Sequence, residues 1–273
     1  MLPLLEFAAG DKVLAAVRLN HVVTHIDYAG QHVRVTTAEH GEFIANAVLI
    51  TVPLGVLKAG SVQFHPALPQ RKQAAIDRMG FGLLNKVVLE YDQLDKPFWP
   101  EVQSFLTLRL DDVDKTKPEV AADLLPRDSI TFMNCGREGE RPALMAHVHC
   151  SLATFVESHT DEQVGELFGR HLARFFPEAK DTKPTRTIVT RWLADPFSRG
   201  SYSHIPVGGD VDDIKALAEP CGEHANNEHK PVLFWAGEHT LPEKHAHVHG
   251  ALESGSVAAK QLLAQFPALA KRP

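Results

Sequence analysis

RMGFGLLNKVVLEYD, residues 78–92, is the stretch on which the organisation of this chain depends. Gly80 and Gly82 open it like a dinucleotide-binding fingerprint, and Lys86 follows like the lysine of a phosphate-binding loop. The fingerprint requires a third glycine, and it must follow a strand and open a helix. Here position 85 is asparagine, and the order is helix, glycines, strand. Lys86 is also not preceded by glycine or followed by Ser or Thr, so we reject both phosphate-binding motifs.

The hydrophobic pattern changes its period across Gly80. Residues 68–79, LPQRKQAAIDRM, carry a proline near the start and apolar residues at helical spacing, which predicts a short helix that the glycine ends. Beyond the glycines the side chains alternate, with Val87 and Leu89 on one face and Lys86 on the other. The stretch therefore predicts a helix stop followed by a strand that carries a lysine.

The rest of the chain reads as alternating strands and helices. Residues 17–53 contain short runs rich in Val, Ile and Thr, which predict a meander that ends in the buried strand AVLIT. Thr160 and Gln163 form a capping box before an amphipathic helix. Other expected elements are strands within 104–110, 129–135, 143–150, 185–196 and 231–237, an exposed charged loop at 111–127, a helix within 208–220, and a final helix whose Leu252, Val257, Leu262 and Leu263 face a core.

Composition narrows the class of protein. The 273 residues are 44% hydrophobic and 23% charged, as in ordinary globular domains. A net charge of −6 without a basic cluster argues against direct nucleic-acid binding. Three cysteines without a CxxC pair favour a reducing compartment, and no apolar run is long enough to cross a membrane. We expect an intracellular protein, cytoplasmic or nuclear, and keep a peroxisomal location open.

Histidine-rich stretches raise a metal-binding alternative. Alternate histidines on a strand share a face and can chelate a metal. The stretches are His245, His247 and His249; His147 and His149, followed by Cys150; and Cys221, His224 and His229. No carboxylate stands at ligand spacing, and a chain with 16 histidines contains HxH pairs by chance. We expect no metal site, and a metallohydrolase remains the less favoured hypothesis.

Four blocks, in this order, resemble the C-terminal half of the flavin-dependent amine oxidases, the family of polyamine oxidases, monoamine oxidases and lysine-specific histone demethylases. They are VLITVPLGVLKAG (48–60), MGFGLLNKVVLEYD (79–92), RWLADPFSRGSYS (191–203) and FWAGEHTLPEKHAHVHGALESG (234–255). The similarity runs from about residue 17 to about residue 263. The sequences of the blocks most resemble those of the polyamine oxidase and histone demethylase branch.

The resemblance implies an α/β fold in which a partial, Rossmann-like FAD-binding domain carries an inserted α+β substrate domain built on a mixed sheet. The expected ranges are 1–82 for the first part of the FAD domain, 83–210 for the substrate domain and 211–273 for the second part of the FAD domain. The family's N-terminal GxGxxG segment, which cradles the FAD pyrophosphate, is not found in these residues. We therefore expect a missing N-terminal half, supplied by a longer gene product or by another chain.

The resemblance also implies site residues. Lys86 matches the catalytic lysine that holds a water against the flavin N5. Trp192 matches an aromatic packed beside the flavin and the substrate, and Tyr202 matches one wall of the cage around the substrate amine. His247 occupies the position of the second wall, where the family usually has Tyr or Thr, which leaves the identity of the amine open.

Further positions are implied for the cofactor. Glu238 matches a residue of the second FAD segment, the backbone of His247 and Val248 matches the contact with the flavin pyrimidine edge, and Val23 matches a contact on the adenine side. Monoamine oxidases bond FAD through a cysteine where this chain has Ser201, so FAD should be non-covalent.

The implied reaction is oxidation of a polyamine or a lysine-type amine to an imine, with O2 as the acceptor and H2O2 as the product. A small-molecule amine or a lysine-containing peptide is the implied partner. The alternative is an inactive amine-oxidase-like fragment or partner-binding module.

Overall fold

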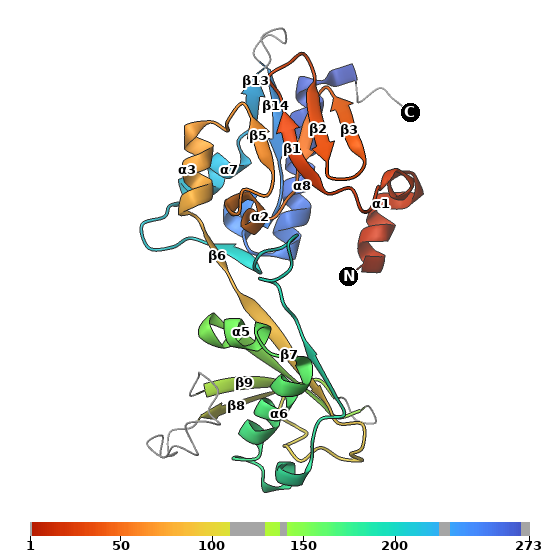
Figure 1. Ribbon diagram of the computed structural model, residues 1–273, viewed down its shortest axis with the longest axis vertical. Coiled ribbons are helices and arrows are strands. Elements are labelled where there is room, and N and C mark those ends of the chain that lie inside the picture. Colours follow the sequence, from red (N-terminus) through yellow and green to blue (C-terminus); the bar gives the residue numbers. More distant parts are fainter. Residues whose placement is uncertain (1, 110–128, 137–140, 224–229, 269–273) are drawn as a thin grey trace. The chain divides into compact units, whose positions relative to one another are not determined.

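A computed structural model describes residues 2–109, 129–136, 141–223 and 230–268. The chain forms two compact units (Figure 1). The first unit comprises Met1–Val52, Leu57–Arg78 and Val207–Pro273, and the second comprises Pro53–Val56 and Met79–Pro206. The chain passes from the first unit to the second within the stretch 78–92.

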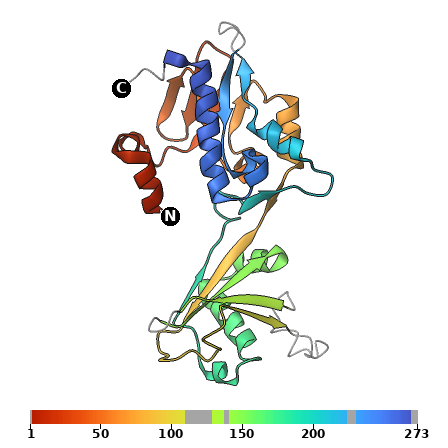
Figure 2. The ribbon, with the colours of Figure 1, turned by 180° about the vertical axis from the view of Figure 1, so that it is seen from behind.

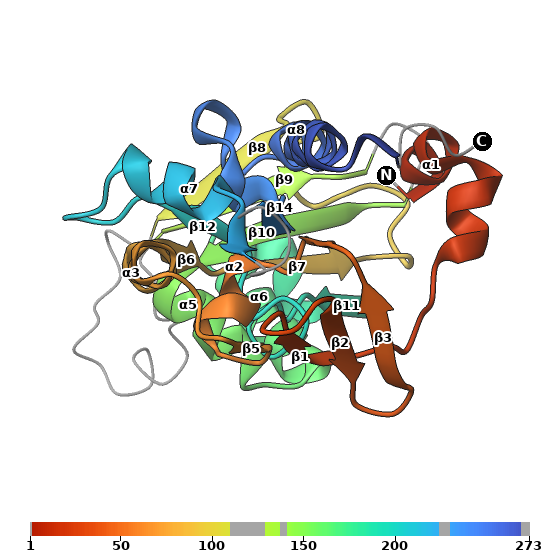
Figure 3. The ribbon, with the colours of Figure 1, turned by 90° about the horizontal axis from the view of Figure 1, so that it is seen from above.

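The first unit contains a four-stranded sheet in the order β3-β2-β1-β5, which is seen from above in Figure 3. β1 (Val23–Asp27), β2 (Val33–Thr37) and β3 (Gly41–Ala45) form the predicted antiparallel meander, and β5 (Gln63–His65) adds parallel to β1. The expectation that AVLIT ends this meander is wrong, because β4 (Val48–Ile50) pairs in a different sheet.

β4 belongs to a three-stranded sheet in the order β13-β14-β4. β14 (Pro231–Trp235) runs parallel to β4, and β13 (Cys221–Glu223) runs antiparallel to β14. Residues 232–235 of β14 are all buried, as expected for an apolar strand covered on both faces. The long helix α8 (Val248–Gln265) packs along β14 (Figure 2).

A buried lysine connects two helices of this unit, α3 (Gln70–Arg78) and α7 (Val211–Ala218). α3 and α7 lie side by side, and Lys72 of α3 donates from Nζ to the carbonyl oxygens of Ala216 and Leu217, at 2.8 Å each. The same Nζ lies 4.4 Å from the centroid of the Trp235 ring. Burial lowers the pKa of Lys72 to about 8. The helices of the unit are α1 (Leu2–Ala16), α3 (Gln70–Arg78), α7 (Val211–Ala218), α8 and the 3₁₀ turns η2 (Glu238–Thr240) and η3 (Pro242–Lys244), and α2 (Leu54–Lys58) spans the change of unit at residue 57.

The predicted core face of α8 is wrong for three of its four residues. Leu252 is 60% exposed, and Val257 and Leu263 are also exposed, whereas Leu262 is half-buried. Its buried positions are instead the small residues Gly250, Ser254 and Ala258, spaced by four. Small side chains let a helix axis approach a sheet closely, and the Ser254 hydroxyl oxygen also accepts a hydrogen bond from the Gly237 N–H at 2.9 Å.

The second unit is built on a five-stranded sheet in the order β11-β7-β10-β9-β8. Every neighbouring pair is antiparallel, so the predicted mixed sheet is wrong for this unit. The connection through the helices α5 and α6 returns the chain to the far side of β7, where β11 pairs antiparallel. The elements are β7 (Leu84–Glu90), β8 (Phe105–Arg109), β9 (Ser129–Asn134), β10 (Ala143–His149), α5 (Cys150–Glu157), α6 (Asp161–Leu172), η1 (Pro177–Asp181) and β11 (Arg186–Val189).

The core of the second unit follows the predicted alternation. Val87 and Leu89 of β7 are fully buried, and α6 contributes the buried Phe168. The capping box is confirmed, since Thr160 Oγ1 accepts from the Gln163 N–H and the Gln163 side chain accepts from the Thr160 N–H. The charged loop expected at 111–127 lies outside the described residues.

The glycines of the opening stretch form a strand as well as a helix stop. α3 ends at Arg78 as predicted, but β6 (Gly80–Gly82) then pairs with β12 (Tyr202–His204). A Cβ on Gly80 would lie 2.2 Å from the His204 ring. Gly200, with φ of 136°, leaves room for the Phe81 ring in the same way. These glycines make space for aromatic rings, which a pattern of local spacing does not reveal.

A buried histidine makes this unit sensitive to acid. His171 lies beside Phe132 and Phe175, and its pKa falls to about 4 because of burial and the nearby Arg174. Between pH 6.5 and 4 the unfolded chain binds a proton that the folded chain does not, so stability falls as the pH falls. We expect this histidine alone to lower the free energy of unfolding by about 3 kcal/mol over that range. Urea denaturation at both pH values should show that much less loss in His171→Phe, and equal losses would contradict the assignment.

Candidate functional site

Lys86 stands on β7 with its backbone held on both sides. Its N–H donates to the Thr190 hydroxyl at 2.8 Å, and its carbonyl oxygen accepts from the Thr190 N–H at 3.0 Å. The side chain is half-buried, on the face opposite the buried Val87, and the residue pairs with His147 of β10. A lysine is thus presented from the middle of a rigid sheet rather than from a loop.

Asn85, the neighbour of this lysine, is the centre of a buried hydrogen-bond network. Its Nδ2 donates to Glu157 Oε1 at 2.7 Å. Its Oδ1 accepts from the Thr190 hydroxyl at 3.0 Å and from the Trp192 N–H at 3.2 Å. The asparagine is fully buried, and it connects the strand that carries Lys86 to the segment that carries Trp192.

Glu157 holds the next part of the same segment. Its two carboxylate oxygens accept from the backbone N–H groups of Leu193 and Ala194, at 3.0 and 2.9 Å. Sequence reasoning identified neither Glu157 nor Asn85 as functional. The available signal was a polar residue at position 85, where the alternation of β7 calls for a buried apolar side chain.

The aromatic side chains of this region are exposed while their backbone is fixed. Trp192 is 40% exposed, Tyr202 is 38% exposed and Phe197 is also exposed. The Trp192 carbonyl oxygen accepts from the Gly200 N–H at 2.9 Å. Large apolar side chains held open in this way are typical of a ligand-binding surface.

Ser201 fixes the strand that leads to Tyr202. Its hydroxyl donates to the Leu84 carbonyl oxygen and accepts from the Leu84 N–H, at 2.9 Å in both cases. Its own N–H donates to the Gly82 carbonyl oxygen at 2.8 Å. The serine side chain thereby replaces a missing pair of strand-to-strand hydrogen bonds.

In the first unit, Glu238 shapes the turn before α8. Its Oε2 accepts from the Ala246 N–H at 2.8 Å, and its carbonyl oxygen accepts from the same N–H at 3.3 Å. Ala246 has a φ of 63°, which is unusual for a residue with a side chain. The carboxylate therefore supports a strained turn directly ahead of the helix.

The N-terminus of α8 is open. His247 is the N-cap and makes no side-chain cap, because its Nδ1 lies 2.7 Å from the His245 carbonyl oxygen. Val248 is 59% exposed. A Cβ on Gly250 would lie 1.9 Å from the Lys244 carbonyl oxygen, so the first turn packs closely on η3. The positive end of an 18-residue helix is thus presented without a side-chain cap.

Val23 begins β1 opposite Thr37, and the register of the pair shifts between Val23 and His25. Its side chain is half-buried. This irregularity at the end of a strand leaves local backbone groups outside the regular ladder.

The predicted site residues divide between the two units. The second unit contains Lys86, Trp192 and Tyr202, and the network of Asn85 brings the first two together. The first unit contains Val23, Glu238, His247 and Val248, of which the last three lie in one continuous turn and helix start.

The structure does not support the metal-binding alternative for the histidine-rich stretches that it describes. His245 follows η3, His247 is an N-cap and His249 is helical, so these three histidines do not share the face of a strand. His147 and His149 do share a face of β10, but among the described residues no group of three or more His, Cys, Asp or Glu side chains could hold a metal ion. His224 and His229 lie outside the described residues.

None of the helices in the described part of the chain is both long and apolar enough to cross a membrane.

Comparison with known protein families gives one match over nearly the whole chain. The model of the flavin-containing amine oxidoreductases matches residues 4–263. Polyamine oxidase 4 of rice (Oryza sativa subsp. japonica) is 35% identical over 245 residues, which is 90% of this chain and 45% of that protein. Histone demethylase-like protein A of Aspergillus fumigatus is 34% identical over 260 residues, which is 90% of this chain and 22% of that protein.

Solved structures agree in fold. Cyclohexylamine oxidase from Brevibacterium oxydans superposes with a TM-score of 0.67 at 20% identity, covering 91% of this chain and 49% of that one. A redesigned putrescine oxidase gives a TM-score of 0.67 at 19% identity, covering 93% of this chain and 50% of that one. The chain therefore spans about half the length of these proteins or less.

Proposed function

Because this chain belongs to the flavin-containing amine oxidoreductase family, we propose that its residues serve the FAD-dependent oxidation of a polyamine or a lysine-type amine to an imine. The amine loses a hydride from the carbon next to nitrogen and a proton from nitrogen. O2 takes up both electrons and two protons and leaves as H2O2. Since the chain spans less than half of its rice relative, the activity is proposed for the complete oxidase fold.

The observation that carries this proposal is the coupling of Lys86 to an exposed aromatic surface. Asn85 and Thr190 fix the lysine backbone and the Trp192 backbone to one another. Rigid aromatic side chains such as Trp192 and Tyr202 orient a neutral amine and exclude water from it. The lysine ammonium group would hold a water molecule and supply a proton during reoxidation or imine hydrolysis.

The first unit, which corresponds to the FAD-binding part of the fold, would hold the cofactor. The second unit would hold the substrate. FAD, when bound, supplies the two-electron acceptor. The open N-terminus of α8 suits an electron-rich ring edge at the backbone of His247 and Val248, and a helix dipole favours such a charge by about 0.3–1 kcal/mol. Glu238 would keep that turn in place, and Val23 would contact the adenine side.

The attachment of FAD is proposed to be non-covalent. Position 201 is a serine, and its hydroxyl already donates to and accepts from the backbone of Leu84. Serine has no thiol with which to form a bond to the flavin ring. Its hydroxyl is also already engaged as both a donor and an acceptor.

The test is flavin content followed by flavin reduction. The complete oxidase, purified without added cofactor and then incubated with FAD, should show a flavin absorption band that spermine or a lysine-containing peptide bleaches in the absence of O2. Acid precipitation should release all of the flavin into solution. Protein that retains no flavin under either condition would instead support the non-catalytic module.

A variant of α8 tests the cofactor site itself. Gly250→Val places a side chain against the Lys244 carbonyl oxygen and should reduce flavin retention at least tenfold, while Lys96→Glu, at an exposed position of the second unit, should leave it unchanged. Equal retention by both variants would remove α8 from the proposed site.

A further inference from the structure

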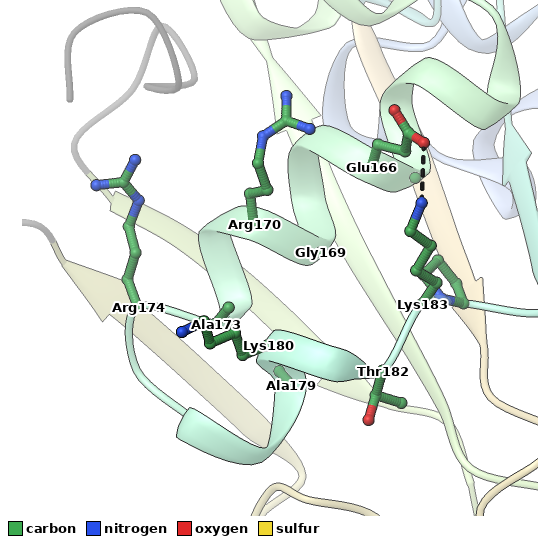
Figure 4. A pocket seen from close by; sticks show the side chains of 11 residues that line it. Glu166, Gly169, Arg170, Ala173, Arg174, Ala179, Lys180, Thr182 and Lys183 are labelled. Carbon is green, nitrogen blue, oxygen red and sulfur yellow. Dashed lines mark hydrogen bonds and ion pairs between the residues drawn. The ribbon is translucent and has the colours of Figure 1, made fainter. Parts of the chain in front are cut away.

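A groove in the second unit contains none of the candidate site residues described above. It has a volume of about 590 Å³ and runs between α6, η1 and the segment that leads to β11 (Figure 4). Small side chains form much of its lining, at Gly169, Ala173 and Ala179. Four cationic side chains, Arg170, Arg174, Lys180 and Lys183, also line it.

The charge of the groove is opposite to that of the protein. Glu166 is the one carboxylate among its lining residues, and it is paired with Lys183 at 3.3 Å. Figure 4 shows this pair at one end of the groove, and it shows Arg170 and Arg174 extending in the same direction from the other. A surplus of cationic side chains in a groove, on a protein of net charge −6, favours an anionic ligand there.

A second hollow continues the groove. It has a volume of about 300 Å³ and shares Gly165, Glu166, Lys183 and Pro184 with the first. Its other lining residues include Asp161 and Glu162, at the N-terminus of α6, and Arg186. Asp161 is paired with Arg191 at 2.7 Å. The track along α6 therefore carries mostly cationic side chains at one end and charges of both signs at the other.

Gly169 lines the groove at a helical position where the backbone does not require a glycine. A Cβ there would meet only the Cδ of Pro184, at 3.9 Å, and the residue lies inside a helix, where other side chains are more favourable than glycine. Gly165 differs, because its Cβ would lie 2.2 Å from the Thr187 hydroxyl. Packing explains Gly165, whereas no close packing contact requires a glycine at position 169.

The charges of the groove disfavour two other classes of ligand. A polyamine or a lysine side chain is cationic in solution and is repelled by the arginine end. A nucleic acid binds through many phosphate contacts, and the groove offers a short cluster rather than an extended basic face. A track that continues from one hollow into a second along α6 fits an extended peptide better than a compact metabolite.

We propose that this groove binds an extended acidic peptide segment of a partner protein. The carboxylates of the peptide pair with Arg174 and Lys180, its backbone lies over Gly169 and Ala173, and a following basic residue faces Glu162. Arginine is suited to this role because its guanidinium group binds a carboxylate in a bidentate manner. The interaction would recruit the protein to a partner without using the amine site.

Fluorescence anisotropy tests the proposal on the full chain. The probe is a fluorescein-labelled peptide of three glutamates followed by glycine, serine and lysine, and a peptide with three lysines in place of the glutamates is the control. We expect saturable binding of the acidic probe, weakened by salt, and none of the lysine peptide. The absence of saturable binding of the acidic probe would overturn the proposal.

Two variants locate the binding. Lys180→Glu should weaken it at least tenfold, and Gly169→Leu should do the same by filling the groove, with an unchanged circular dichroism spectrum. Lys96→Glu is the matched charge reversal at an exposed site of the same unit and should bind like the wild type. Equal losses in Lys96→Glu, or equally tight binding of a single-stranded oligonucleotide, would indicate a general polyanion surface and overturn the peptide assignment.

Discussion

Lys86→Met is expected to lower the rate of amine oxidation by about 10²-fold or more in the complete oxidase, the scale of a lost general acid or base. Methionine keeps the length and the apolar stem of lysine, so the half-buried position on β7 stays filled. The backbone bonds to Thr190 do not involve the side chain. Flavin should therefore remain bound while its reduction or its reoxidation slows.

Stopped-flow absorbance of the flavin separates these two half-reactions. Lys96→Met, at an exposed position of the same unit, is the matched control and should oxidise amine at the wild-type rate. If Lys86→Met turns over amine as fast as the wild type, the lysine has no part in the chemistry. A loss of bound flavin would instead indicate a structural role for the lysine.

Asn85→Leu is expected to destabilise the second unit by about 2–4 kcal/mol, since it leaves several buried polar groups without their partner. The Trp192 N–H and the Thr190 hydroxyl lose their acceptor, and Glu157 loses one donor. The Trp192 segment should loosen with the fold, so amine oxidation should fall even at temperatures where the chain stays folded.

Urea denaturation followed by circular dichroism measures the loss in stability. Asn134→Leu is a suitable control, because Asn134 Nδ2 donates to the Glu101 carbonyl oxygen at 3.2 Å in an exposed setting. The control should change the free energy of unfolding by less than about 1 kcal/mol. A stability of Asn85→Leu equal to that of Asn134→Leu would show that the network contributes little to the fold.

The features that the sequence predicts well are local. The helix stop at Gly80, the alternation of Val87 and Leu89 and the capping box of Thr160 each depend on residues a few positions apart. These interactions form within a single element, so their spacing is visible in the chain itself.

The features that it misses depend on contacts between distant segments. Asn85 bonds Thr190 and Trp192 across more than 100 residues, and no local pattern encodes such a pair. The same holds for β4, which leaves the meander for β14, and for α8, whose packing face is set by how closely it approaches β14. These outcomes are decided by the residues that a strand or helix contacts in the fold. The intrinsic propensity of its own residues does not decide them.

The candidate site shows the same division. Alternation alone places Lys86 on a strand, but only the resemblance to a family gave the lysine a role. The structure added Asn85 and Glu157, which hold the site without resembling a catalytic motif. Supporting residues of this kind become visible only when their partners are known.

The double hydrogen bond between Ser201 and Leu84 also bears on how such proteins can diversify. A cysteine at this position would offer a site for tethering a cofactor, but a thiol is a weak donor and a weak acceptor, so both bonds would be lost in the same step. Replacing Ser201 with cysteine would therefore weaken strand pairing in the same step that changed the chemistry of this position. The order of the local backbone and the proposed mode of cofactor attachment thus depend on one side chain.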